Sequence, residues 1–182
     1  MRIDGRTGIV DVARQVASPN CDDRPAGVAA DLIVLHGISL PPGHFVGDAI
    51  DRLFTNALAP EEHPYFREVA GLRVSTHLLV RRDGEVVQYV PLHRRAWHAG
   101  ESCYRGRRAC NDFSIGIELE GTDDAPYADA QYARLAETLR ELLATYPVLD
   151  RRRIVGHCDI APGRKTDPGP AFDWPRLYRS LD

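Results

Sequence analysis

The stretch of residues 156–170 (GHCDIAPGRKTDPGP) gathers the side chains best suited to chemistry. It places His157 and Asp167 around a stiff loop of proline and glycine, with Lys165 two residues before Asp167. Imidazole and carboxylate groups are zinc ligands in proteins, and a catalytic zinc site needs three protein ligands and one open position. The stretch therefore predicts part of a metal site whose third ligand lies elsewhere in the chain.

The candidate for that third ligand is His36, at the end of an apolar run of residues 31–36 (DLIVLH). Such a run is typical of a buried central strand. Residues 153–157 (RIVGH) form another strand pattern that ends in a histidine. If the two strands are parallel neighbours, His36 and His157 lie at the same edge of the sheet and, with Asp167, complete a ligand set. Each histidine is equally well explained as an ordinary polar residue at a strand end.

Candidate proton carriers lie on a strand predicted over residues 113–120 (FSIGIELE), whose isoleucine and leucine side chains form its buried face. Glu118 and Glu120 share the polar face, where a glutamate is usually solvated. Beside a zinc-bound water it could instead act as general base and then as acid for a leaving amine. Lys165 could stabilise an oxyanion, or be an ordinary loop lysine in water.

Other histidines and one cysteine compete for these roles. His77 lies inside a strand pattern and is expected in the core or in support of the site, whereas His98, beside Trp97, could contact a substrate or simply lie on the surface. Cys158 would point away from His157 in a strand and is interpreted as a small buried hydrophobe. Three further histidines fall in predicted loops without a role: His44, His63 and His93.

The remaining patterns predict the elements that position these residues. They indicate an N-terminal covering segment over residues 1–30, and a single α/β domain over residues 1–182 with a mixed sheet of about five strands and three helices. The expected elements are a short helix over residues 47–59 ended by Pro60, an irregular loop over 61–71, a hairpin over 72–90 turning at Asp83-Gly84, a long helix over 129–146, and a closing helix capped by Asp173.

Composition and charge exclude several classes of protein. The formal net charge of −3 and the absence of a basic block argue against a nucleic-acid partner. No apolar run is long enough to span a membrane or to form an export signal, so we expect a cytoplasmic chain with reduced cysteines and no membrane association. We expect it to be a monomer.

Six runs of the chain resemble a known enzyme family. They are VLHGISLPPG from Val34, HPYF from His63, RRDGEVVQYVP from Arg81, RAWHAG from Arg95, CNDFSIGIELEGT from Cys110, and residues 156–170. In this order they resemble the cytoplasmic AmpD-type 1,6-anhydro-N-acetylmuramyl-L-alanine amidases of Gram-negative bacteria, and more distantly the phage-type amidases and peptidoglycan recognition proteins. The chain departs from the AmpD pattern at Gly37, where asparagine is usual, and in the arginines of residues 107–109.

The resemblance implies a peptidoglycan recognition protein-like fold and zinc-dependent cleavage of anhydromuropeptides in cell-wall recycling, with an indirect effect on β-lactamase induction. It assigns zinc to His36, His157 and Asp167, acid/base catalysis to Glu118, and transition-state support to Lys165. It also places substrate contacts at four residues: Arg73, Trp97, His98 and Arg107. Two alternatives stay open, an envelope amidase acting on intact peptidoglycan and a non-catalytic muropeptide receptor.

Overall fold

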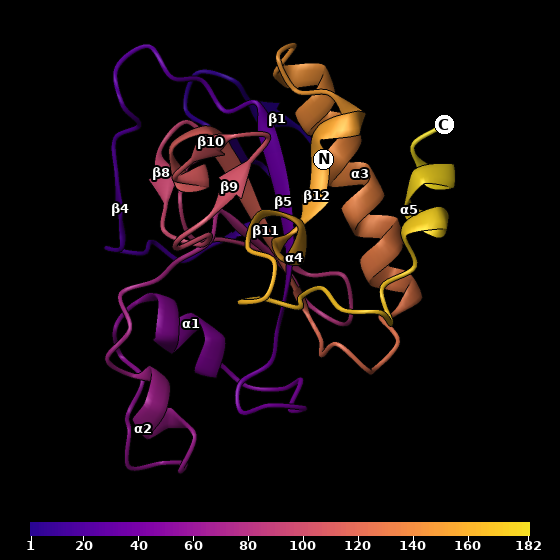
Figure 1. The fold of residues 1–182 in the computed structure, drawn as a ribbon. Coiled ribbons are helices and arrows are strands. Elements are labelled where there is room, and N and C mark those ends of the chain that lie inside the picture. Colours follow the sequence, from indigo (N-terminus) through magenta and orange to yellow (C-terminus); the bar gives the residue numbers. More distant parts are fainter.

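A six-stranded mixed β-sheet forms the centre of the chain in a computed structural model, which describes residues 1–182 (Figure 1). The strands lie in the order β12 (Ile154–Gly156), β5 (Leu32–Ile38), β11 (Ser114–Glu120), β6 (Leu78–Val80), β7 (Val86–Gln88) and β3 (Arg14–Gln15). All neighbouring strands are parallel except β6 and β7, which form an antiparallel hairpin. The predicted α/β architecture with a mixed sheet flanked by helices is confirmed.

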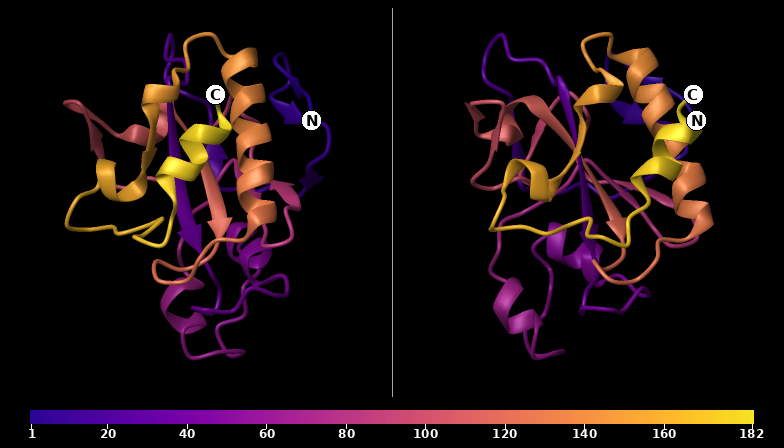
Figure 2. Two further views of the ribbon diagram at one scale, coloured as in Figure 1. Left: turned by 90° about the vertical axis from the view of Figure 1, so that its right-hand side faces the viewer. Right: turned by 45° about the vertical axis from the view of Figure 1, so that its right-hand side comes forward.

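One face of the sheet is covered by the long helix α3 (Asp129–Thr145), which packs beside α5 (Trp174–Ser180) (Figure 2). The apolar stripe of α3 lies in one buried cluster with Ile33 and Leu35 of β5 and with the isoleucines and Leu119 of β11. The side chain of Gln131 fixes the start of α3, because its amide donates to the carbonyls at the ends of β6 and β11. Both helices match the predicted ranges closely.

The opposite face of the sheet carries the polar residues of β5 and β11. Side chains alternate along a strand, so His36 points away from α3 together with Leu32 and Val34. This face is covered by α1 (Ala49–Phe54) and by the segment of residues 97–113, which includes the 3-10 turn η1 (Cys110–Phe113). The prediction that β11 has only one buried face is therefore wrong, since all seven of its residues are buried.

Several boundaries differ from the sequence prediction. Helix α1 ends at Phe54, well before Pro60, because Asn56 adopts a left-handed backbone conformation with φ of 61°. The expected irregular loop contains a one-turn helix, α2 (Phe66–Val69), which lies with α1 at one end of the molecule (Figure 1). The hairpin turns at Gly84 as predicted, but its first strand begins only at Leu78.

The N-terminal segment is more ordered than the covering loop that was predicted. It contains β1 (Ile3–Asp4), β2 (Ile9–Val10), β3 and β4 (Cys21–Asp22), and β3 extends the central sheet. Four short elements complete the fold: β8 (Arg95–Ala96), β9 (Cys103–Tyr104), β10 (Arg107–Arg108) and the 3-10 turn η2 (Arg151–Arg153). No helix in the structure has the length and apolar character needed to cross a bilayer.

Candidate metal centre and active site

Two parallel neighbouring strands bring His36 and His157 together. Strands β12 and β5 pair in parallel, with Gly156 opposite Leu35, so the residues that follow lie side by side. His157 is the first residue of the short helix α4 (His157–Ile160), and the Asp159 carboxylate fixes this turn by accepting from the Gly156 amide at 2.7 Å. The predicted parallel arrangement of the two strands is confirmed.

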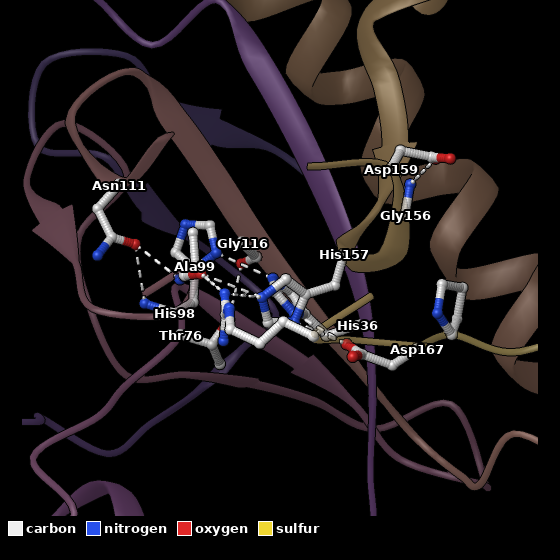
Figure 3. A network of polar contacts seen from close by, with 12 residues as sticks. His36, Thr76, His98, Ala99, Asn111, Gly116, Gly156, His157, Asp159 and Asp167 are labelled. Atoms are coloured by element: carbon white, nitrogen blue, oxygen red, sulfur yellow. Dashed lines mark hydrogen bonds and ion pairs between the residues drawn. The ribbon is translucent and has the colours of Figure 1, made fainter. Parts of the chain in front are cut away.

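Asp167 completes a triangle of possible ligand atoms with the two imidazoles (Figure 3). The Nδ1 atoms of His36 and His157 are 2.9 Å apart, and Asp167 Oδ2 lies 3.2 Å from the first and 3.0 Å from the second. The backbone carbonyl of Asp167 accepts from the amide of Cys158, which ties the loop to the start of α4. Both imidazoles are buried and the carboxylate is mostly so.

The donor set fits zinc in chemical type and spacing. Two imidazole nitrogens and one carboxylate oxygen form a common catalytic ligand set, and ligand atoms of one zinc ion held at about 2.0–2.2 Å lie roughly 3.3 Å apart. Burial lowers the pKa of His36 to about 4, so the ring is neutral at physiological pH, as a ligand must be. Burial would raise the pKa of Asp167, but contacts with His157 and His36 lower it further, so the carboxylate is ionised.

Cys158 does not join this triangle. The reason given from the sequence was wrong, because residues 157 and 158 are helical and do not alternate across a strand. Its thiol is only partly buried, and the group of potential ligand atoms contains no sulfur.

Glu118 lies directly beside His36 on the same face of the sheet. The two residues are register partners in the parallel β11–β5 pair. Glu118 is 8% exposed, and its Oε2 atom has no hydrogen-bond partner. Burial, together with the charge of Asp167, raises the pKa of Glu118 well above the ordinary glutamate value. A carboxyl group of this kind can hold and release a proton near neutral pH, as a general acid or base must.

Glu120, which periodicity could not separate from Glu118, has a different environment. Its two oxygens accept from Arg81 and from the backbone amide of Arg82, both at 3.2 Å. It lines another cavity, of about 550 Å³, which is bordered by ion pairs of Arg14 and Arg81 with acidic residues. Both of its oxygens are therefore engaged within the protein.

A cavity of about 400 Å³ opens over the triangle and Glu118. Lys165 lines it and is exposed, and no hydrogen bond or ion pair holds its ammonium group. The opposite wall is apolar and comes largely from α1, α2 and the loop after β5: Leu40, Leu53, Phe54, Tyr65, Val69 and Val74. The cavity thus places a polar floor with ionisable groups opposite an apolar wall.

The four predicted substrate contacts fall in different places. His98 lines the cavity, but both of its ring nitrogens already contact protein groups, namely His36 and Ser114. Arg73 is exposed between two residues that line the cavity. Trp97 does not line it, because its indole N–H donates to Asp22.

Arg107 lies away from the cavity. Its guanidinium pairs with Asp31, just before β5 begins, and stacks on the ring of Phe113 at 3.7 Å. The carboxyl ends of the parallel strands, where His36 and Glu118 lie, are at the other end of the sheet. Arg107 is therefore not brought together with the predicted ligands.

Two further residues shape the site without any signal in the sequence. The Tyr127 hydroxyl donates to the carbonyl of Pro168, next to Asp167, and occupies the space beside Gly37, where a Cβ atom would lie 2.5 Å from it. Asn111 bonds to two amides of the segment that packs on the imidazoles. His77, by contrast, is fully buried as expected, and its ring bonds to backbone groups.

Comparison with known proteins relates this site to one enzyme family. Residues 26–170 match the N-acetylmuramoyl-L-alanine amidase family. The chain is 61% identical to the 1,6-anhydro-N-acetylmuramyl-L-alanine amidase AmpD of Salmonella typhimurium (strain SL1344), over 93% of this chain and 89% of that protein.

Solved structures give the same relationship. A crystal structure of AmpD superposes with a TM-score of 0.96 at 55% identity, covering all of both chains. The Escherichia coli amidase AmiD, in complex with its substrate anhydro-N-acetylmuramic acid-L-Ala-D-γ-Glu-L-Lys, has a TM-score of 0.61 at 28% identity, covering 94% of this chain and 62% of that one.

Proposed function

The chain belongs to the N-acetylmuramoyl-L-alanine amidase family, as an AmpD-type 1,6-anhydro-N-acetylmuramyl-L-alanine amidase, and we propose that its hydrolysis of anhydromuropeptides depends on zinc. The bond cleaved is the amide between the lactyl group of 1,6-anhydro-N-acetylmuramic acid and L-alanine. The observation that carries this proposal is the convergence of two neutral imidazoles, one carboxylate and a separate buried carboxyl group on one cavity.

His36, His157 and Asp167 would hold the metal. A zinc ion bound there supplies Lewis acidity, which polarises the amide carbonyl and makes water a better nucleophile near neutral pH. Asp167 contributes the one negative charge of the ligand set, and the two imidazoles leave an open position toward the cavity. The burial of both rings excludes bulk water from the ligand side of the site.

Glu118 moves the proton. Its carboxylate takes a proton from the attacking water and delivers it to the alanine nitrogen as the C–N bond breaks, so the peptide leaves as an amine. The raised pKa of Glu118 suits both steps, because the group accepts a proton more readily than an ordinary glutamate. Its unpartnered Oε2 has no competing donor within the protein.

Lys165 would stabilise the negative charge that develops on the carbonyl oxygen. Its ammonium is free of protein partners and belongs to the cavity lining. A cation at this place contributes most in the transition state, when the oxygen becomes an oxyanion. We further propose that Arg73, beside the cavity, contacts the carboxylates of the stem peptide.

In the cell, the proposed role is the cytoplasmic recycling of cell-wall fragments, with a consequent lowering of β-lactamase induction. The AmpD proteins at about 60% identity, and the AmiD complex with an anhydromuramyl tripeptide, support a muropeptide as the substrate.

The test compares soluble anhydromuropeptide with intact sacculi as substrates of the purified protein, with chelator and after zinc is restored. We expect release of free peptide from the soluble substrate, loss of activity with chelator and recovery with zinc. Preferential release from sacculi would favour an envelope amidase. Binding of muropeptide without cleavage at any zinc concentration would favour a receptor and contradict the proposal.

A further inference from the structure

The second ring nitrogen of His36 contacts another histidine. When Nδ1 of a neutral imidazole binds a metal, the ring proton resides on Nε2, which must then find an acceptor. His36 Nε2 lies 2.9 Å from Nδ1 of His98. His98 accepts there only if its own proton is on Nε2, and that atom lies 3.1 Å from the Ser114 hydroxyl oxygen. The Ser114 hydroxyl in turn donates to the carbonyl of Cys110, so every donor has an acceptor.

His157 is held in the same way by the next residue of the same segment. Its Nε2 lies 3.1 Å from the carbonyl oxygen of Ala99, which leaves Nδ1 without a proton and facing the metal position. The same carbonyl also accepts from Arg164 at 2.6 Å. The side chain of His98 and the backbone of Ala99 therefore orient the two imidazoles of the site.

One side chain fixes both of these residues. Asn111 Oδ1 accepts from the amide of His98 at 3.0 Å and from the amide of Ala99 at 2.8 Å (Figure 3). The ring of His98 also needs Gly116 beneath it, because a Cβ atom there would lie 2.5 Å from the ring. The segment is thus located by an amide oxygen on one side and by a glycine on the other.

We propose that Asn111 is a positioning residue of the metal centre, which orients His36 through the ring of His98 and His157 through the carbonyl of Ala99. The inference rests on the proposed zinc site. Asn111 touches neither ligand, and its effect passes through two backbone amides. The amide nitrogen of its side chain makes no hydrogen bond, so only its oxygen is required for this role.

The matched variants are Asn111→Asp, which keeps an oxygen acceptor, and Asn111→Leu, which has a similar volume and no acceptor. Zinc affinity of the full chain is measured by competition with a chromophoric chelator. Nitrogen-detected NMR of the histidine rings reports which ring nitrogen carries the proton. We expect a 10- to 100-fold weaker zinc affinity and mixed ring tautomers for N111L. For N111D we expect the wild-type tautomers and an affinity within about threefold of wild type, which is small beside that loss.

Three outcomes would overturn the inference. Wild-type zinc affinity in a folded N111L would refute it alone, as would an equal loss in N111D and N111L. A wild-type protein that binds no zinc would refute both this inference and the proposed zinc dependence, which separates the two failures. Should N111L fail to fold, Asn111→Ser, whose side chain is too short to reach both amides, replaces it with the same expected loss.

Discussion

Replacing Glu118 by glutamine is expected to abolish activity and, in the metal-free protein, to increase stability. The native carboxyl group is 8% exposed, and its Oε2 has no hydrogen-bond partner. A buried polar atom without a partner costs about 1–3 kcal/mol, and more when it is charged. Glutamine keeps the shape without the charge, so we expect a gain of about 1–3 kcal/mol at pH 8. For a chain of this length each kcal/mol corresponds to about 2–4 °C in Tm.

The gain should depend on pH in a defined direction. Burial raises the pKa of Glu118 in the folded state, so the native protein binds more protons than the unfolded chain between the ordinary value of about 4.3 and the raised value. Native stability therefore falls as the pH rises through this window, whereas that of Glu118→Gln does not. The two proteins should be equally stable below about pH 4.3, where the carboxyl is protonated in both states.

The assay is thermal unfolding of both proteins in chelator across this pH range, with Glu120→Gln as the matched control. Both oxygens of Glu120 have partners, so its replacement should bring no gain. Bound zinc favours the charged carboxylate and should reduce the advantage of Glu118→Gln. Turnover should fall by about 10²- to 10⁴-fold, the usual contribution of a general acid–base group. A lower Tm for the metal-free variant at pH 8, or a difference unchanged between pH 4 and 8, would refute the reasoning.

Three further perturbations probe other parts of the site. Lys165→Ala should lower kcat by about 10²- to 10³-fold, while urea titration should find stability within about 0.5 kcal/mol of wild type because the side chain is exposed; unchanged kcat would remove Lys165 from the mechanism. Tyr127→Phe leaves the buried carbonyl of Pro168 without its donor and should cost about 1–3 kcal/mol in the same titration, and an unaltered midpoint would contradict this. Zinc at 100 times its Kd should stabilise the metal-free chain by about 2.7 kcal/mol in calorimetry, whereas a Tm independent of zinc would argue against the metal site.

The ligand pair of the site could be predicted because it depends on strand patterns. The apolar runs before His36 and His157 indicate buried strands, and parallel neighbours place their carboxyl ends together. The long helix α3 was equally predictable from its apolar stripe, which needs no knowledge of its partners.

Other features depend on packing that periodicity does not encode. Glu118 and Glu120 share a strand face, and only the position of Arg81 shows which one is already paired. The burial of that face follows from the segment of residues 97–113, whose sequence has no regular period. The contacts of Asn111 join residues 12 and 13 positions apart through backbone amides, which no side-chain pattern reveals.

The most direct test of the central claim is hydrolysis of purified anhydromuropeptide in ¹⁸O-labelled water, with mass spectrometry of both products. If water attacks the lactyl carbonyl with Glu118 as the proton carrier, one ¹⁸O atom appears in the carboxylate of the anhydro-sugar and none in the released peptide. Label in the peptide, or cleavage at any other bond, would contradict the account.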